Sequence, residues 1–567
     1  MNCRRKRLSI LLSCTTLALL LAGCSGSSTP NSTEDSASSD SASSGSAESS
    51  GDNSFSYDEM FTGRDLSGEY DAQEAISIQL SDDGSTCSSS FVSIDNNIIT
   101  ITGEGTYLLL GTLTEGQVIV DADDAKVQLV FDNTNITCAS SAALYIRSAD
   151  KVFLTLADGS DNTLSTTDEF VAIDDNNIDA AIFSKDDLVL NGSGTLTVTC
   201  DYGHGIVSKD DLKATGGTYE ITAAGHALCG KDSVRIADGT FHLVSEKDGI
   251  HSANDDDTSL GYIYLAGGTM EIAAADDGIH ADQMLFIDGG EIHITQSYEG
   301  LEGSAITIND GSAVIVASDD GLNAAGNTLT NDITINGGTL CIDADGDGID
   351  ANRNLTVNGG QIYVSGPTSS ADSALDFDGT GTITGGTVVA CGAGQMAQNF
   401  GDTSTQASML VNLSASTSET LVLTDADSNE IVSFSPDKSY NSVVISSPSI
   451  AVGENYTLTC GSQSTTIEMS SLIYGKGQQM GGGMKGGGGM KPGMRDNTDG
   501  SRPDDMTGER PQMPDDTTGE RPQMPDNTMG EKPQIPDDTM GKRPQMPNDT
   551  MGEPPTNMPN DNEGNTL

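Results

Sequence analysis

The residues of this chain that could do chemistry recur in front of one repeated apolar position. Five carboxylates stand two residues before an Ile or Leu that returns every 21 to 29 residues: Asp248, Asp277, Glu299, Asp320 and Asp347. A repeat of this length predicts stacked units, in which equivalent residues form a column with a spacing of about 4.8 Å. Two carboxylates at that spacing repel by about 3 kcal/mol at an effective dielectric constant of about 20. Ca²⁺ accepts several oxygen ligands in irregular geometry and would relieve this repulsion.

A second column of polar residues directly follows the same apolar position. It consists of His251, His280, Glu302, Asn323, Asp350 and Asp376. The two columns and their neighbours predict at least one calcium site, with the candidate ligands Asp248, Asp277, Asp282, Glu299, Glu302, Asp320, Asp345, Asp347, Asp350 and Asp376. The alternative for any single Asp-Gly pair is a turn in which the Asp side chain bonds its own backbone. Because the earliest units carry His204 and His226 in the first column, we expect calcium in the later units.

Two further sets of side chains bear on carbohydrate chemistry. Tyr264 and Phe286 share one position in successive units and are expected to point outward, either as a sugar platform or as an aromatic ladder that stabilises the sheet. Lys185, Lys209 and Lys231 lie in three successive units and are the candidate bases of a calcium-dependent lyase. The alternative for each lysine is a solvated ion pair with a nearby Asp. A third set alternates outward as a charge ladder or a transition-metal site: Glu220, His242, Glu271 and His293.

The elements that must position these residues are short strands. In one unit, residues 278–281, 285–287 and 291–294 alternate in polarity, and a Gly-containing turn precedes the last stretch. Gly recurs at that turn because the corner needs a positive φ. Three strands in each unit predict an all-β fold, a right-handed parallel β-helix over residues 55–400. Residues 401–472 lose the repeat, and predicted strands at 420–423, 430–434, 442–445 and 456–459 are expected to form a small C-terminal β cap.

Composition limits the partners and the location. The 567 residues carry a formal net charge of −58, which excludes a cationic groove for nucleic acid. Residues 1–23 are typical of a bacterial lipoprotein signal peptide, so lipid on Cys24 is expected to anchor the protein at the extracellular face of the cytoplasmic membrane. Residues 24–54 predict a disordered tether. Residues 473–567 are a Gly/Met- and Pro-rich repeat tail, either a spacer or a docking segment for a cell wall or a partner protein.

Several motifs occur in an order that resembles one known family. They are Thr-Ile-Thr-Gly-Glu-Gly-Thr-Tyr at 100–107, Gly-Gln-Val-Ile-Val at 116–120, Asp-Gly-Ser-Asp-Asn-Thr-Leu at 158–164, Ser-Lys-Asp-Asp-Leu at 184–188 and 208–212, and Ser-Phe-Ser-Pro at 433–436. With the Asp-Gly-Ile repeats, they resemble the carbohydrate-binding-domain lipoproteins of bacteria over roughly residues 57–470. The resemblance implies a fold similar to that of calcium-dependent pectate lyases, and binding of cellulose and acidic pectic polymers.

The function predicted from these observations is calcium-dependent binding of a plant-type polysaccharide, cellulose or pectin, at the cell surface and without cleavage. The identity of the polymer depends on the resemblance alone. Two alternatives stay open at this stage. One is a calcium-dependent pectate lyase, and the other is a structural or adhesin solenoid without sugar specificity.

Overall fold

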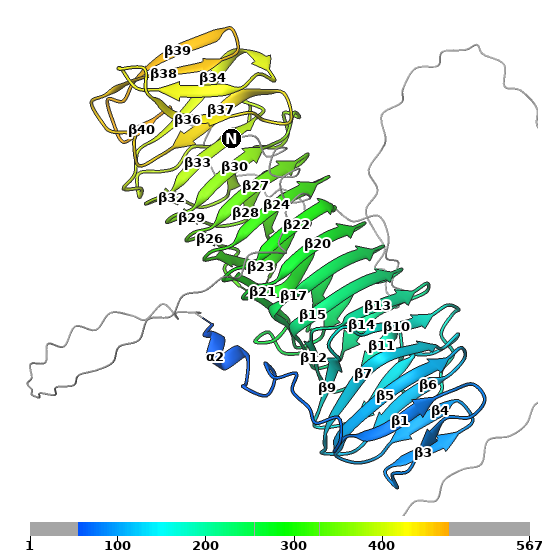
Figure 1. Cartoon of the computed structure of the whole chain (residues 1–567). Helices are drawn as coiled ribbons and strands as arrows, with labels where there is room; N and C mark the ends of the chain where they lie inside the picture. The colour runs from blue at the N-terminus through cyan, green and yellow to red at the C-terminus, as the bar shows by residue number, and fades with distance from the viewer. Residues whose placement is uncertain (1–54, 255, 328, 476–567) are drawn as a thin grey trace, which may run out of the picture. The chain divides into compact units, whose positions relative to one another are not determined.

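The computed structural model describes residues 55–254, 256–327 and 329–475. These residues wind into a β-solenoid of about 12 turns with mostly parallel strands, which confirms the predicted fold. The strands belong to two sheets, one of 36 strands and one of four. Figure 1 shows the turns following one another from the blue N-terminal strands to the yellow and orange C-terminal strands. No helix in the described part of the chain has the length and hydropathy that a membrane crossing requires. The predicted signal peptide, Cys24, the tether and nearly all of the repeat tail lie outside the described residues.

Each turn of the solenoid contributes a strand to each of three faces, and equivalent strands of successive turns pair in parallel. The first face contains β4 (Ile98–Ile101), β6 (Gln117–Asp121), β8 (Leu144–Ser148), β11 (Ala180–Ser184), β14 (His204–Ser208), β16 (Leu228–Gly230), β18 (Ile250–Ser252), β25 (Leu322–Ala324), β28 (Ile349–Ala351), β31 (Asp376–Phe377) and the first parts of β21 (Ile279–Ile287) and β23 (Leu301–Ile308). This face positions the second column of the candidate site.

The second face continues each turn after a corner. It contains β1 (Ile76–Leu80), β5 (Gly105–Leu113), β7 (Lys126–Thr137), β9 (Lys151–Leu156), β12 (Asp187–Gly192), β19 (Tyr262–Leu265), β26 (Ile333–Ile335), β29 (Leu355–Val357), β32 (Gly381–Ile383), the first parts of β15 (Asp211–Ala223) and β17 (Ser233–Ser245), and the second parts of β21 and β23. At the N-terminal end, β2 (Thr86–Cys87) and β3 (Val92–Asp95) pair antiparallel with β1 and β4.

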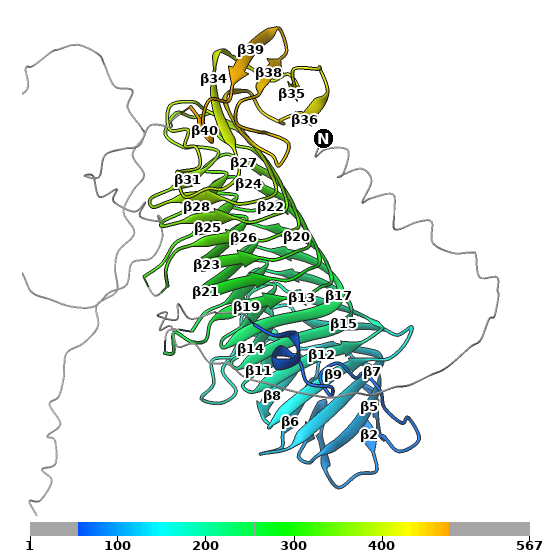
Figure 2. The same cartoon turned by 90° about the vertical axis from the view of Figure 1, so that its left-hand side faces the viewer.

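The third face completes each turn before the first column. It contains β10 (Asp161–Thr166), β13 (Thr195–Cys200), β20 (Thr269–Ala274), β22 (Glu291–Gln296), β24 (Ser312–Ala317), β27 (Thr339–Ala344), β30 (Gln361–Ser365), β33 (Thr387–Gly392), and the second parts of β15 and β17. Figure 2 shows β21, β23, β25 and β28 of the first face stacked in order, beside β20, β22, β24 and β27 of the third.

The core is the stack of inward residues that the alternation predicts. In the unit that begins at residue 278, the inward side chains are at most 3% exposed, and they are Ile279, Ala281, Leu285, Ile287, Ile292 and Ile294. The second Gly of each predicted corner has a positive φ, for example 99° at Gly290 and 87° at Gly360. The Gly of the Asp-Gly-Ile repeat has a different role. A Cβ on Gly300 would lie 2.4 Å from the carbonyl oxygen of Gly321, so this Gly permits the close approach of successive turns.

The C-terminal region differs in one strand from the expected cap. Three of the four predicted cap strands, β35 (Leu421–Thr424), β36 (Glu430–Phe434) and β38 (Asn455–Cys460), join β39 (Gln463–Glu468) in the separate antiparallel sheet. The fourth, β37 (Tyr440–Ser446), instead pairs antiparallel with β33 and with β34 (Ser408–Thr417), and β40 (Ile473–Tyr474) pairs with β34. Because most of β37 is buried, it suits the edge of the last solenoid turn, which would otherwise stay unpaired.

The N-terminal segment around α2 (Tyr57–Met60) lies against the outer side of the second face. Its position bears on the predicted sugar platform. Tyr264 is fully buried and Phe286 is 4% exposed, because Phe55, Met60 and Phe61 pack over both rings. The prediction of a sugar platform at Tyr264 and Phe286 is therefore wrong: these rings do point out of the solenoid core, but the chain itself covers them.

Asp65 fastens this segment to the solenoid. Its carboxylate is fully buried and lies 3.4 Å from Lys151 Nζ and 3.6 Å from Lys213 Nζ. Its backbone carbonyl accepts a hydrogen bond from Thr215 Oγ1 at 2.8 Å. Burial opposes ionisation of Asp65, but the hydrogen bond from the Thr62 backbone N–H and the two lysines lower its pKa. The covered aromatic rings and this buried ion pair together hold the segment in place.

Candidate functional site

The two predicted columns exist as neighbouring rows along the first face. Strand register pairs the members of the second column in the predicted order: His251, His280, Glu302, Asn323, Asp350 and Asp376. The first column lies in the turn that enters the same face. The Gly after each acidic member donates its backbone N–H to the carbonyl oxygen of the next member, for example Gly249 to Asp277. The repeat therefore places titratable side chains of consecutive turns side by side, as the sequence predicts.

Four of the five first-column carboxylates, all except Glu299, have a structural contact with the next turn. Asp248 Oδ1 accepts the backbone N–H of Asp277 at 3.1 Å, and Asp277 Oδ1 accepts that of Glu299 at 3.1 Å. The same contact joins Asp320 Oδ1 to the backbone N–H of Asp347 at 2.6 Å. We name this series of contacts the column ladder. It uses one oxygen of each of these carboxylates and leaves the second oxygen for another partner.

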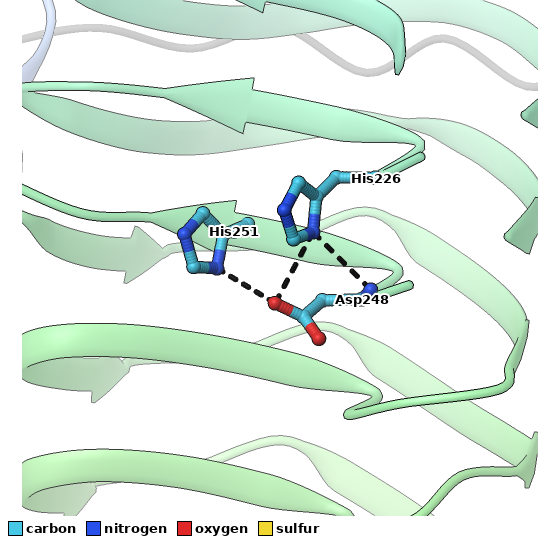
Figure 3. Close-up of side chains that lie close together, drawn as sticks. All are labelled: His226, Asp248 and His251. Atoms are coloured by element: carbon cyan, nitrogen blue, oxygen red, sulfur yellow. Dashed lines mark hydrogen bonds and ion pairs between the residues drawn. The ribbon is translucent and has the colours of Figure 1, made fainter. Parts of the chain in front are cut away.

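The early part of the columns is rich in His. Asp248 Oδ2 lies 3.2 Å from His226 Nδ1, 2.7 Å from His251 Nδ1 and 3.7 Å from His280 Nδ1. Figure 3 shows the rings of His226 and His251 beside one another, with Nδ1 of both directed at Asp248. Burial opposes ionisation of Asp248, but its contacts with the three imidazoles outweigh burial and hold its pKa well below the usual range.

The middle of the columns contains its own cation. His280 Nδ1 lies 3.3 Å from Asp277 Oδ2 and 3.2 Å from Glu302 Oε2. Burial opposes protonation of His280, but the surrounding carboxylates raise its pKa well above the ordinary value. The carboxylates therefore favour the imidazolium form of His280, which offsets part of the negative charge of this group. Burial, with the charges of Asp277 and Glu299, still raises the pKa of Glu302 to about 9.

The late part of the columns has no such cation. Asp320, Asp347 and Asp350, here named the acid-only cluster, offer carboxylate oxygens that all lie within 4.8 Å of one another. Burial and mutual repulsion raise the pKa of Asp320 to about 7 and those of Asp347 and Asp350 to about 8. The ion pairs of the described residues bring no Lys, Arg or His side chain to these three carboxylates. These three carboxylates could hold a cation.

A neutral oxygen lies beside the acid-only cluster. Asn323 is paired in register with Asp350, and its Oδ1 is buried without a hydrogen bond, while its Nδ2 donates to Glu299 Oε2 at 2.8 Å. A buried amide oxygen without a donor carries a desolvation cost that a metal ion would remove. Asp376 follows Asp350 in register and accepts a hydrogen bond from Gln398. Carboxylate and amide oxygens are the ligands that calcium prefers, so these residues fit a calcium ion.

The remaining predicted ligands lie at the margins of the columns. Asp282 Oδ1 is 3.8 Å from His280 Nε2, beside the middle group. Asp345 is not part of the acid-only cluster: its side chain is 70% exposed and pairs with Lys438 Nζ at 3.0 Å. Asp345 therefore contributes no oxygen to the acid-only cluster, although its position in the sequence predicts a ligand.

The candidate lyase bases lie in a different part of the solenoid. Lys209 Nζ is 3.7 Å from Asp179 Oδ2 and sits over the Phe183 ring. Lys231 Nζ is 2.7 Å from Asp256 Oδ2. Register places the turn of Lys231 four turns before that of Asp320, and therefore about 19 Å away at the spacing of stacked strands.

Sequence reasoning missed two kinds of functional candidate. It used His226 only to exclude calcium from the early units. His residues in the same columns at successive turns are themselves the signal of a nitrogen-rich site. It also missed Tyr298, whose side chain is 41% exposed directly before Glu299. A hydrogen bond with Asp319 raises the pKa of Tyr298 to about 12. This ring is an exposed aromatic surface at the edge of the columns.

Comparison with known proteins identifies the family. A family model described as "Carbohydrate-binding domain-containing protein" matches residues 95–332 and 298–426, which together span more than half of the chain. The chain belongs to this carbohydrate-binding domain family. A protein of the same description from Acetivibrio thermocellus is 41% identical over 135 residues, which are 23% of this chain and 47% of that protein. The chain thus matches about half the length of that member of the carbohydrate-binding domain family.

One solved structure is also similar to this chain. It is titled "Structure of the polysaccharide lyase-like protein from C. thermocellum, Gadolinium derivative". The two chains are 29% identical, the match covers 47% of this chain and 94% of the other, and the TM-score is 0.38. The family match confirms the resemblance that the sequence motifs predict.

Proposed function

We propose that this protein binds a plant-type polysaccharide, pectin or cellulose, in a calcium-dependent manner and without cleaving it, as a lipid-anchored protein of the cell surface. The observation that carries the proposal is the acid-only cluster, which places three carboxylates within 4.8 Å in a family named for carbohydrate binding. Three half-buried acids without a positive partner are unfavourable unless protons or a cation neutralise them. Calcium is the cation that suits an all-oxygen ligand set.

Calcium also accounts for binding of an acidic polymer by an acidic protein. A chain with a formal net charge of −58 repels a polyuronate at long range. A calcium ion held by Asp320, Asp347 and Asp350 keeps coordination positions for oxygens outside the protein, because calcium takes six to eight ligands. Uronate carboxylates would fill those positions, and the exposed Tyr298 ring would pack on a sugar face nearby. Binding of pectin is then lost when calcium is removed, whereas contacts with uncharged cellulose persist.

The positions of the basic residues favour binding over elimination. A catalytic base must reach the proton that it removes, and Lys185, Lys209 and Lys231 lie several turns before the acid-only cluster. Arg353 is the nearest basic residue after Asp350 in sequence, and its NH1 atom lies 3.8 Å from Asp332 Oδ2. These arrangements support a site that holds a polymer rather than one that breaks it.

One experiment separates the three functional classes. The purified protein is incubated with polygalacturonate and, separately, with insoluble cellulose, with calcium or with a chelator, and both polymer binding and ultraviolet absorbance of unsaturated product are measured. We expect calcium-dependent binding of polygalacturonate that is lost in Asp350→Asn and kept in the exposed Asp345→Asn. Product that disappears in Lys209→Ala, Lys231→Ala or Arg353→Ala would establish a lyase instead. Lack of binding to both polymers would favour a structural or adhesin role.

The anchor is tested separately. Cys24→Ala is expected to move the protein from the membrane fraction to the medium, because a lipid on this Cys would be the attachment. Unchanged membrane association of the Cys24→Ala protein would contradict the lipid-anchor part of the proposal without affecting the carbohydrate part.

A further inference from the structure

The His-rich part of the columns contains a contact that hydrogen bonding cannot satisfy. His226 Nδ1 accepts the backbone N–H of Asp248 at 3.2 Å, in the same way that His204 Nδ1 accepts the backbone N–H of His226 at 2.9 Å. A ring nitrogen that accepts a hydrogen bond carries a lone pair, so the ring proton of His226 is on Nε2. The same Nδ1 lies 3.2 Å from Asp248 Oδ2. Two acceptors therefore face one another with no proton between them.

Burial maintains this mismatch. The His226 side chain is 13% exposed, so little water reaches the contact. The Asp248 side chain is 3% exposed. A carboxylate and an imidazole lone pair at this distance repel unless a cation lies between them. A ring nitrogen has a single lone pair, so binding of an ion by His226 Nδ1 would replace its hydrogen bond from the Asp248 N–H.

His251 completes the arrangement. Its Nδ1 lies 2.7 Å from Asp248 Oδ2, yet this buried nitrogen forms no hydrogen bond of acceptable geometry. The rings of His226 and His251 are stacked, with centroids 4.2 Å apart and an angle of 11° between their planes. Both therefore present Nδ1 to the same carboxylate oxygen, as Figure 3 shows. The candidate ligand atoms of the three residues all lie within 4.8 Å of one another.

We propose that His226, His251 and Asp248 bind one divalent transition-metal ion with the ligand preferences of zinc. Imidazole nitrogen suits zinc, copper, nickel and cobalt, whereas calcium and magnesium favour oxygen. Two nitrogens and one carboxylate oxygen leave a fourth position of a tetrahedral ion for water or a ligand. The ladder supplies outer support, since the backbone N–H of Asp277 holds Asp248 Oδ1 at 3.1 Å and orients the carboxylate.

This site is distinct from the proposed calcium site. First-column register places Asp248 three turns before Asp320, a separation of about 14 Å at the spacing of stacked strands. The His-rich part offers two neutral nitrogens and one carboxylate, and the acid-only cluster offers oxygens only. The two sites therefore select different metals along one row. Failure of one proposal leaves the other intact.

Cobalt binding tests the proposal with a direct spectroscopic readout. Untagged protein is treated with a chelator, dialysed and titrated with Co²⁺ while the visible d–d bands are recorded, and Zn²⁺ is then added to displace the cobalt. We expect about one equivalent of Co²⁺ with bands typical of four-coordinate nitrogen and oxygen ligation. The absorption should disappear on addition of Zn²⁺ and persist in excess Ca²⁺.

Three variants decide whether these residues are the ligands. His251→Ala and His226→Asn are expected to weaken Co²⁺ binding by at least about tenfold and to remove the bands. The Asn variant keeps an acceptor for the column ladder, and circular dichroism checks that both proteins fold. His242→Ala is the matched control, since His242 is half exposed on the third face and pairs with Glu271. Wild-type affinity and spectrum in His251→Ala and His226→Asn, or no binding by the wild-type protein, would overturn the proposal. Asp350→Asn should keep Co²⁺ binding even if it loses calcium.

Discussion

Replacing Asp350 by Asn should have opposite effects on the metal-free and the calcium-bound protein. Burial and the charges of Asp320 and Asp376 raise the pKa of Asp350 to about 8. Between its unfolded pKa near 4 and that value, the folded protein binds more protons than the unfolded one, so the free energy of unfolding falls as pH rises. At pH 7 a carboxyl that must stay protonated in the fold costs up to about 4 kcal/mol. Asp350→Asn removes this cost, and the metal-free variant should be more stable than the wild type at pH 7 by a part of that amount.

Calcium should reverse the order. At a free calcium concentration 100 times its Kd, binding to the folded state adds about 2.7 kcal/mol to the wild-type stability. The variant has lost one of three carboxylate ligands and should gain much less. The assay is urea unfolding followed by circular dichroism at pH 5 and pH 8, with calcium or with a chelator. The wild type without metal should be less stable at pH 8 than at pH 5, and the variant should show a flatter pH dependence.

The matched control is Asp345→Asn, because Asp345 is an exposed acid of the same turn that pairs with Lys438 instead of joining the acid-only cluster. Removing an exposed ion pair changes stability by about 1 kcal/mol or less. Asp345→Asn should therefore keep both the pH dependence and the calcium response of the wild type. The reasoning is refuted if Asp350→Asn destabilises the metal-free protein at pH 8 while its response to calcium equals that of the wild type.

Three further predictions concern the framework. Tyr264→Ala should lower the free energy of unfolding in urea by about 3–5 kcal/mol, because the ring is fully buried under the N-terminal segment, and should leave cellulose binding unchanged. Asp65→Asn should cost about 3 kcal/mol at pH 7, since it removes one of the two carboxylates beside the buried Lys213, the other being Asp211 at 3.7 Å. Because the pKa of Asp65 is lowered in the fold, its contribution is present above pH ~4 and is lost as pH falls through the lowered pKa, so the variant should lose less stability than the wild type on acidification. Gly300→Ala should lower the thermal midpoint, because the new Cβ would meet the Gly321 carbonyl oxygen at 2.4 Å, whereas Gly63→Ala, where a Cβ meets nothing within 4 Å, should not.

The solenoid and both columns were predictable because they depend on local periodicity. Alternation fixes which side chains point inward, and the spacing of the Ile or Leu residues fixes which turns are equivalent, so the pairing of His280 with Glu302 follows from sequence alone. The covering of Tyr264 was not predictable in this way. Phe55 and Phe61 lie about 200 residues before it, and no periodic signal links an irregular N-terminal segment to one face of a later turn.

The chemistry within the columns was only partly predictable. Asp345 and Asp347 are two residues apart in the sequence, and both are candidate ligands there. Only Asp347 joins the acid-only cluster, because membership depends on the direction of each side chain after the corner. Similarly, the sequence of β37 predicts a short apolar strand next to those of the cap. Its place on the last solenoid turn depends on which strand edge needs a partner, and that is a property of the assembled fold.

The column ladder explains why one row can hold two kinds of site. Six side chains of the first column accept the backbone N–H of the next turn: His204, His226, Asp248, Asp277, Asp320 and Asp347. Folding therefore constrains this position to a hydrogen-bond acceptor and leaves its type free. Since nitrogen and oxygen acceptors both serve the ladder, the change from His in the early turns to acids in the later ones determines which ligand atoms lie along the row. In the proposed metal sites, the same backbone presents nitrogen ligands at one end of the row and oxygen ligands at the other.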